Sequence, residues 1–101
     1  MLTVEDARRI SKEMSSDIVA KSQDKIAEKV SYAESKIMEA IEHNCTFTNV
    51  TFDEFEGGLV KRLNTAIVDE IVRRLRFNGF VVDPIAEYAI NAIYYNISWA
   101  V

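Results

Sequence analysis

Apolar residues recur every three or four positions along the first forty residues of the chain, which is the spacing of one face of an α-helix. Charged residues of both signs occupy the positions between them, and no glycine or proline interrupts the segment. Thr3, with Asp6 three residues later, fits a capping box at the helix start. We therefore predict a long helix over residues 1–44, with a stripe made of Ile10, Met14, Ile18, Ile26, Val30, Ala33, Ile37 and Ile41.

This helix is too long for its own domain. A straight helix of this length measures about 58 Å, whereas a compact chain of 101 residues has a radius of gyration of about 13 Å. One solution is a break at Ser22, where the stripe lacks a member, with a second helix folding back as a hairpin. The other, which we favour, is that a second copy of the chain covers the stripe. The predicted homo-oligomer interface consists of Ile10, Met14, Ile18, Ile26, Val30 and Ile37.

After this segment the pattern changes to short strands around one further helix. The stretch "CTFTNVTF" (residues 45–52) is rich in residues that favour strands, and its alternation slips phase near Asn49. Apolar residues at helical spacing then predict a helix over residues 59–77. Asn78 and Gly79 supply the left-handed backbone that ends such a helix.

The end of the chain predicts two further strands. "FVV" (residues 80–82) reads as a strand, and "YYNISWAV" (residues 94–101) as its antiparallel partner with one apolar face. Between them, a proline preceded by an aspartate predicts a short helix over about residues 84–91. The fold class is therefore α+β, with a small, mostly antiparallel sheet whose helices lie on one face. We expect residues 1–44 to be an oligomerisation segment and residues 45–101 a small α+β domain.

Composition argues against several classes of function. The net charge of −4 argues against nucleic acid as a partner, because a phosphate-backbone binder would be basic. Cys45 and His43 are the only residues of their kinds, which argues against a disulfide, a zinc site and a catalytic dyad, so we expect no metal and no cofactor. The first residues lack the apolar core of a signal peptide, and the uncharged residues 88–101 are too few to span a bilayer. We expect a cytoplasmic protein without a membrane partner.

Basic residues gather at the end of the predicted helix over residues 59–77. Arg73 and Arg76 are neighbours one turn apart, and cations in a last turn suit the helix dipole, which is the simpler explanation. The alternative is a site for an anion or a nucleotide phosphate, because guanidinium groups bind phosphates through paired N–H donors. The candidate ligand-binding residues are Arg73, Arg74, Arg76, Tyr94, Tyr95 and Trp99.

The second half of the chain is similar to small uncharacterised accessory proteins of tailed bacteriophages. The similarity covers roughly residues 37–99 and is carried by three stretches. They are "IMEAIEHNCTFTNVTF", the helix end with Asn78, Gly79, Phe80 and Val82, and the final strand with Ile97, Ser98 and Trp99. The resemblance implies a viral origin and a role as a virion part, a host-takeover factor or an inhibitor of host defence. It supplies no catalytic residue.

These features together favour a non-enzymatic, homo-oligomeric binding protein encoded by a phage. It would sequester or block a host protein or a small anionic, nucleotide-like signalling ligand in the host cytoplasm. The alternative is a structural protein of the virion or of an assembly, in which the N-terminal helix is packing surface. An enzyme is the least supported class, because no nucleophile and base occur at a suitable spacing.

Overall fold

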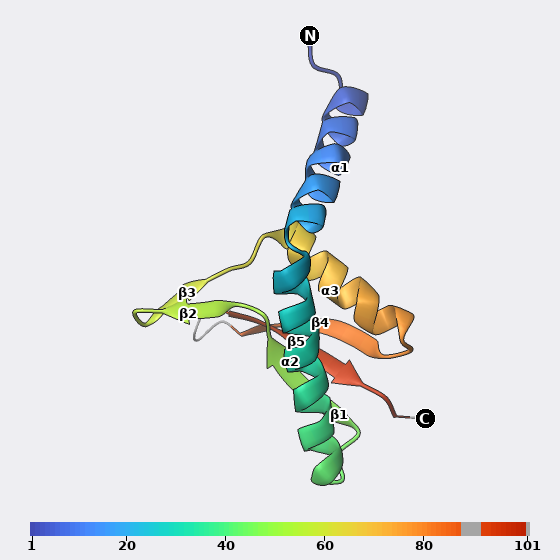
Figure 1. Ribbon diagram of the computed structural model, residues 1–101, viewed down its shortest axis with the longest axis vertical. Coiled ribbons are helices and arrows are strands. Elements are labelled where there is room, and N and C mark those ends of the chain that lie inside the picture. Colours follow the sequence, from blue (N-terminus) through green and yellow to red (C-terminus); the bar gives the residue numbers. More distant parts are fainter. Residues whose placement is uncertain (88–91, 101) are drawn as a thin grey trace.

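The computed structural model describes residues 1–87 and 92–100 and has the predicted α+β architecture (Figure 1). Two consecutive helices lead into a three-stranded sheet, and a small hairpin and a third helix are inserted after the first strand. In chain order the elements are α1 (Val4–Lys21), α2 (Gln23–Glu42), β1 (Phe47–Thr51), β2 (Glu54–Glu56), β3 (Leu59–Lys61), α3 (Thr65–Phe77), β4 (Val81–Glu87) and β5 (Ala92–Ser98).

The N-terminal helix begins as predicted but does not run unbroken. Asp6 N donates to Thr3 Oγ1 over 3.0 Å, and Thr3 N donates to Asp6 Oδ2 over 3.4 Å, which completes the capping box. At Ser22 the backbone leaves helical geometry, with φ −112° and ψ 22°. The helices do not fold back as a hairpin, since α2 continues away from α1 (Figure 1). The predicted N-terminal helical segment is therefore present, with the break at Ser22 that one of the two alternatives contained but without the hairpin of that alternative.

The central strand of the three-stranded sheet is β5, which pairs antiparallel with β1 on one side and β4 on the other. Val82 pairs with Ile97, so the predicted return of residues 80–82 against the last strand is confirmed. The short helix predicted over residues 84–91 is wrong for residues 84–87, which continue β4, and residues 88–91 lie outside the described part. Pro84 is compatible with this strand because β4 is an edge strand, where a missing outward N–H breaks no ladder bond.

The segment before α3 holds another correction. The helix predicted over residues 59–77 starts only after Asn64, whose side-chain oxygen accepts a hydrogen bond from Ala66 N at 2.9 Å. Before that cap, β2 and β3 form an antiparallel hairpin that turns at Gly57 and Gly58. Their φ angles are +57° and +80°, which glycine adopts without the steric cost of a Cβ. The first apolar residues assigned to the helix therefore belong to a strand.

The hydrophobic core joins α2 and α3 to one face of the three-stranded sheet. Alternation along the strands directs Val50, Val82 and Ile97 to this face, where they meet the apolar sides of the two helices. Each fully buried large apolar side chain stabilises the fold by about 1.5–3 kcal/mol. The buried core consists of Ile26, Ala33, Ile37, Val50, Phe52, Ile71, Val72, Leu75, Val82 and Ile97.

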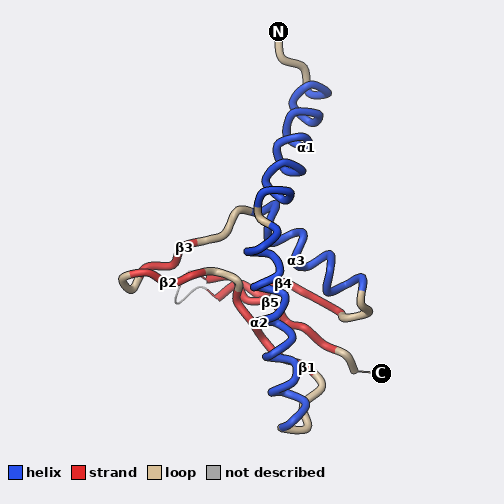
Figure 2. The backbone as a smooth tube through the Cα atoms, in the orientation of Figure 1, coloured by secondary structure: helices blue, strands red, loops and turns tan. Residues whose placement is uncertain are grey.

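No residue of α1 is buried in this core. α1 projects beyond the rest of the molecule, while the β2–β3 hairpin stands to one side of α2 (Figure 2). The chain is consequently 56 Å long, with a radius of gyration of 15.6 Å, above the value of about 13 Å for a compact chain of this size. Near the end of α1, Val19 packs against the core.

Candidate functional site

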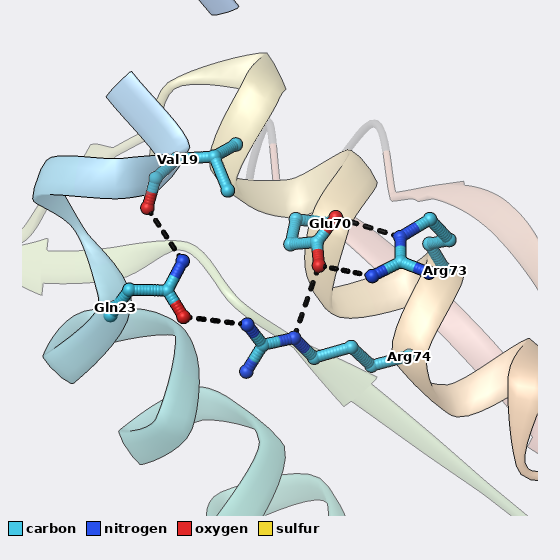
Figure 3. Close-up of polar contacts among 5 residues, drawn as sticks. All are labelled: Val19, Gln23, Glu70, Arg73 and Arg74. Carbon is cyan, nitrogen blue, oxygen red and sulfur yellow. Dashed lines mark hydrogen bonds and ion pairs between the residues drawn. The ribbon is translucent and has the colours of Figure 1, made fainter. Parts of the chain in front are cut away.

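Two of the arginines predicted to bind an anion are already engaged with their own helix (Figure 3). Arg73 donates from Nε to Glu70 Oε2 at 2.8 Å and from Nη2 to Glu70 Oε1 at 2.6 Å. Arg74 donates from Nε to Glu70 Oε1 at 3.1 Å and from Nη2 to Gln23 Oε1 at 2.7 Å. Gln23 in turn donates from Nε2 to Val19 O at 2.8 Å. These five residues form a relay of hydrogen bonds from α3 to the junction between α1 and α2.

The charged centre of this relay is Glu70, whose side chain is only 14% exposed. Hydrogen bonds from Arg73, and then from Arg74, lower the pKa of Glu70 from 4.5 to about 2, against the opposing effect of burial. The same carboxylate raises the pKa of Arg73. An external anion would have to compete with Glu70 for both guanidinium groups. The spacings of three and four residues were visible in the sequence and could have indicated these pairs.

Two other predicted ligand residues contact the protein itself. Arg76 Nη2 donates to Val82 O at 2.7 Å, which ties the end of α3 to β4. Trp99 meets the ring of Phe80 edge-on, with ring centroids 6.3 Å apart. Such edge-to-face aromatic pairs stabilise a fold beyond the area they bury. Arg76 and Trp99 therefore both contact residues at or next to β4 of their own chain.

The two predicted tyrosines lie on opposite faces of the sheet, because neighbouring residues of a strand alternate. Tyr95 is half-buried on the core face, with its ring centroid 5.5 Å from that of Phe52. Burial raises the pKa of Tyr95. Tyr94 pairs in register with Thr51 on the other face. The structure thus does not bring the six predicted ligand residues together at one site.

The predicted oligomer interface divides into two groups. Ile26 and Ile37 are 0% and 5% exposed, so the prediction is wrong for them: the sheet and α3 of their own chain cover both side chains. Val30 is partly buried against the same core. Among the predicted members in α1, Ile10 and Met14 are exposed and Ile18 is half-buried.

His43 and Cys45 do not form a catalytic pair in this structure. Cys45 Sγ donates to the backbone oxygen of His43 at 3.7 Å, and both residues are exposed. Within residues 1–87 and 92–100, no three side chains of histidine, cysteine, aspartate or glutamate gather closely enough to hold a metal ion.

A groove of about 670 Å³ follows the outer edge of β1, and the sequence did not predict it. One wall is α2, and the other is the strand itself, with Phe55 of the hairpin and Tyr94 also lining the space. Phe47 and Phe55 are 51% and 55% exposed, so apolar surface faces solvent here. The strand pattern of residues 45–52 was recognisable, but a pattern does not tell which edge of a strand stays unpaired. The residues of α2 along the groove are Tyr32, Lys36, Glu39, Ala40 and His43.

Comparison with known proteins adds no assignment. No family model matches the chain, and neither a curated protein nor a solved structure shows significant similarity to it. The resemblance to phage accessory proteins therefore stays a prediction. Among the helices of the described residues, none combines the length and hydrophobicity that crossing a bilayer requires. The function has to be argued from two surfaces, α1 and the groove beside β1.

Proposed function

We propose that the chain is a non-enzymatic binding protein that assembles into a homo-oligomer through α1. The observation that supports this is that α1 buries none of its residues, although apolar residues recur along one side of it. Val4, Ile10 and Met14 are 67%, 40% and 60% exposed. Covering such surface is favourable by about 25 cal/mol per Å², and a contiguous exposed apolar surface marks an interaction site.

A second α1 is a suitable partner because the helix is electrically balanced. It contains four acidic and four basic residues, interleaved along its length, so two copies do not repel each other. Some of these charges already pair locally and stay in water, as in Lys21 with Asp17 at 3.0 Å, whose side chains are 75% and 62% exposed. Two such helices can bury their stripes while keeping their charges in water.

The resulting oligomer would act by binding and blocking a partner rather than by catalysing a reaction. Because Glu70 already pairs with Arg73 and Arg74, the arrangement favours a host protein over a small anion as the partner. The resemblance to phage accessory proteins supports sequestering or blocking that protein in the host cytoplasm. The alternative, a structural part of a virion or another assembly, would use the same α1 contact.

Sedimentation equilibrium of the wild-type chain and of Met14→Glu tests the α1 contact. We expect the wild type to self-associate and Met14→Glu to weaken association at least about tenfold, since a charge replaces a side chain worth about 1.5–3 kcal/mol when buried. Arg9→Gln is the matched control, because it changes the charge by the same amount outside the stripe. A monomeric wild type, or equal effects of both substitutions, would refute the proposal.

A further inference from the structure

The two outer edges of the sheet differ in their backbone hydrogen-bonding groups. On β4, Val82 O points outward and accepts a hydrogen bond from Arg76 Nη2 at 2.7 Å. Since inward and outward positions alternate along an antiparallel strand, Pro84 faces outward as well, and proline has no N–H to donate. Arg76 and Pro84 therefore protect this edge against pairing with another strand.

The outer edge of β1 lacks this protection. Trp99 N donates to Thr46 O at 3.0 Å, which fixes the phase of the β1–β5 pairing. By alternation, Phe47, Asn49 and Thr51 direct their N–H and C=O groups away from β5. Within residues 1–87 and 92–100, no strand pairs with them on that side. The sequence "FTNVT" has neither a charge nor a proline, so this edge is a template for strand addition.

Beside this open edge, one side of α2 faces the groove. Tyr32, Lys36, Glu39 and His43 recur at three- and four-residue steps along α2 and line the groove. Lys36 Nζ lies 3.5 Å from Glu39 Oε2, so this side of α2 carries both signs of charge within one turn. An occupant of the groove can therefore pair a strand with β1 and place groups of complementary charge against Lys36 and Glu39.

We propose that this occupant is a second copy of the chain, with the two β1 strands pairing antiparallel about a two-fold axis at Asn49. In this register Asn49 faces the partner's Asn49 and Phe47 faces the partner's Thr51, so outward N–H groups meet outward C=O groups. The sheet becomes continuous across both copies. The proposal deepens the proposed self-association but uses a surface separate from α1.

Side chains near the two-fold axis can form favourable contacts with side chains of the second copy. Asn96 Nδ2 donates to Asn49 Oδ1 at 2.9 Å, which leaves the Asn49 amide nitrogen able to donate to the partner's Asn49. The same axis brings the two α2 helices together antiparallel, so that Lys36 faces the partner's Glu39 and Glu39 faces the partner's Lys36. Opposite charges facing each other in this way fix the register of the pair.

The test uses the full chain carrying Met14→Glu, which weakens the α1 contact. We expect this variant to be a dimer by sedimentation equilibrium. Adding Asn49→Pro removes an outward N–H and lowers the association constant about tenfold or more. Asn96→Ala is the control, because it removes the same side-chain hydrogen bond but keeps the backbone edge intact. Circular dichroism melting of each variant checks that the chain is folded.

A charge exchange tests the register even if the proline variant fails to fold. Lys36→Glu and Glu39→Lys should each weaken the dimer, because like charges then meet across the axis. An equimolar mixture of the two variants should recover dimers, since opposite charges face each other again in the mixed pair. An effect confined to one chain cannot produce this recovery, so a mixture that stays monomeric would overturn the two-fold register.

The outcomes separate the two contacts. A monomeric Met14→Glu chain overturns the β1 contact and supports the α1 contact. A dimer that resists Met14→Glu and dissociates on Asn49→Pro alone overturns the α1 contact and supports the β1 contact. If neither substitution changes the association of the wild type, both proposals fail.

Discussion

Replacing Glu70 by glutamine tests whether the hydrogen-bond relay holds the helix junction against α3. The substitution keeps the size of the side chain and removes the negative charge that Arg73 and Arg74 share. Arg74 then loses a partner that orients its guanidinium group toward Gln23, which in turn contacts the last turn of α1. We expect Glu70→Gln to lower the free energy of unfolding at pH 7.

The magnitude follows from the shifted pKa of Glu70. Its pKa falls from 4.5 to about 2 on folding, so its stabilisation is fully present above pH 4.5 and is lost as the pH falls toward 2. Arg73, the main partner, is 64% exposed, and solvent screens that part of the interaction. After this reduction we expect a loss of about 1–2 kcal/mol at pH 7.

Urea unfolding followed by circular dichroism at pH 7 and pH 3 measures this loss, at one protein concentration so that self-association contributes equally. The difference between wild type and Glu70→Gln should be clearly smaller at pH 3. Glu56→Gln is the control, because Glu56 is 80% exposed and its ion pair with Lys61 spans 3.9 Å. Unchanged stability at pH 7, or a loss that is the same at both pH values, would refute the reasoning.

Two further substitutions address the core and the cap of α3. Ile26→Ala should cost about 2–5 kcal/mol in the same urea assay, because Ile26 is 0% exposed, whereas Ile41→Ala, at a side chain 46% exposed, should cost clearly less. Gly79→Ala should lower stability by about 1–2 kcal/mol through backbone strain alone, since Gly79 has a φ of +95° and no atom lies within 4 Å of an added Cβ; a melting temperature equal to that of the wild type would contradict this.

Local signals in the sequence predicted a helix end correctly where the residues fit only one kind of structure. The capping box at Thr3 and the end of α3 at Gly79 are observed as predicted. The start of α3 was misplaced because Leu59 and Val60 fit both a helical stripe and a short strand. The two glycines, Gly57 and Gly58, form the turn of a hairpin and so place Leu59 and Val60 in a strand. From the sequence, these glycines were interpreted only as a break between elements.

Pairing with a distant strand overrode the local preference at Pro84. An aspartate followed by a proline suits a helix start, yet the chain there pairs with β5, where Ile85 lies opposite Tyr94. The candidate site failed for a related reason. Three basic residues near the end of a helix suggested an anion site, but whether a guanidinium group is available depends on its neighbours in space, and Glu70 occupies two of the three.

Two separate self-complementary surfaces on one chain have a consequence for the size of the assembly. If α1 pairs with α1 and β1 with β1, each about its own two-fold axis, the two axes generate either a closed tetramer or an open chain of alternating contacts. Each single variant, Met14→Glu or Asn49→Pro, should then leave dimers, and only the double variant should give monomers. A wild-type chain that stops at a tetramer fits a binding protein of fixed size, whereas association that continues to rise with concentration fits the structural alternative.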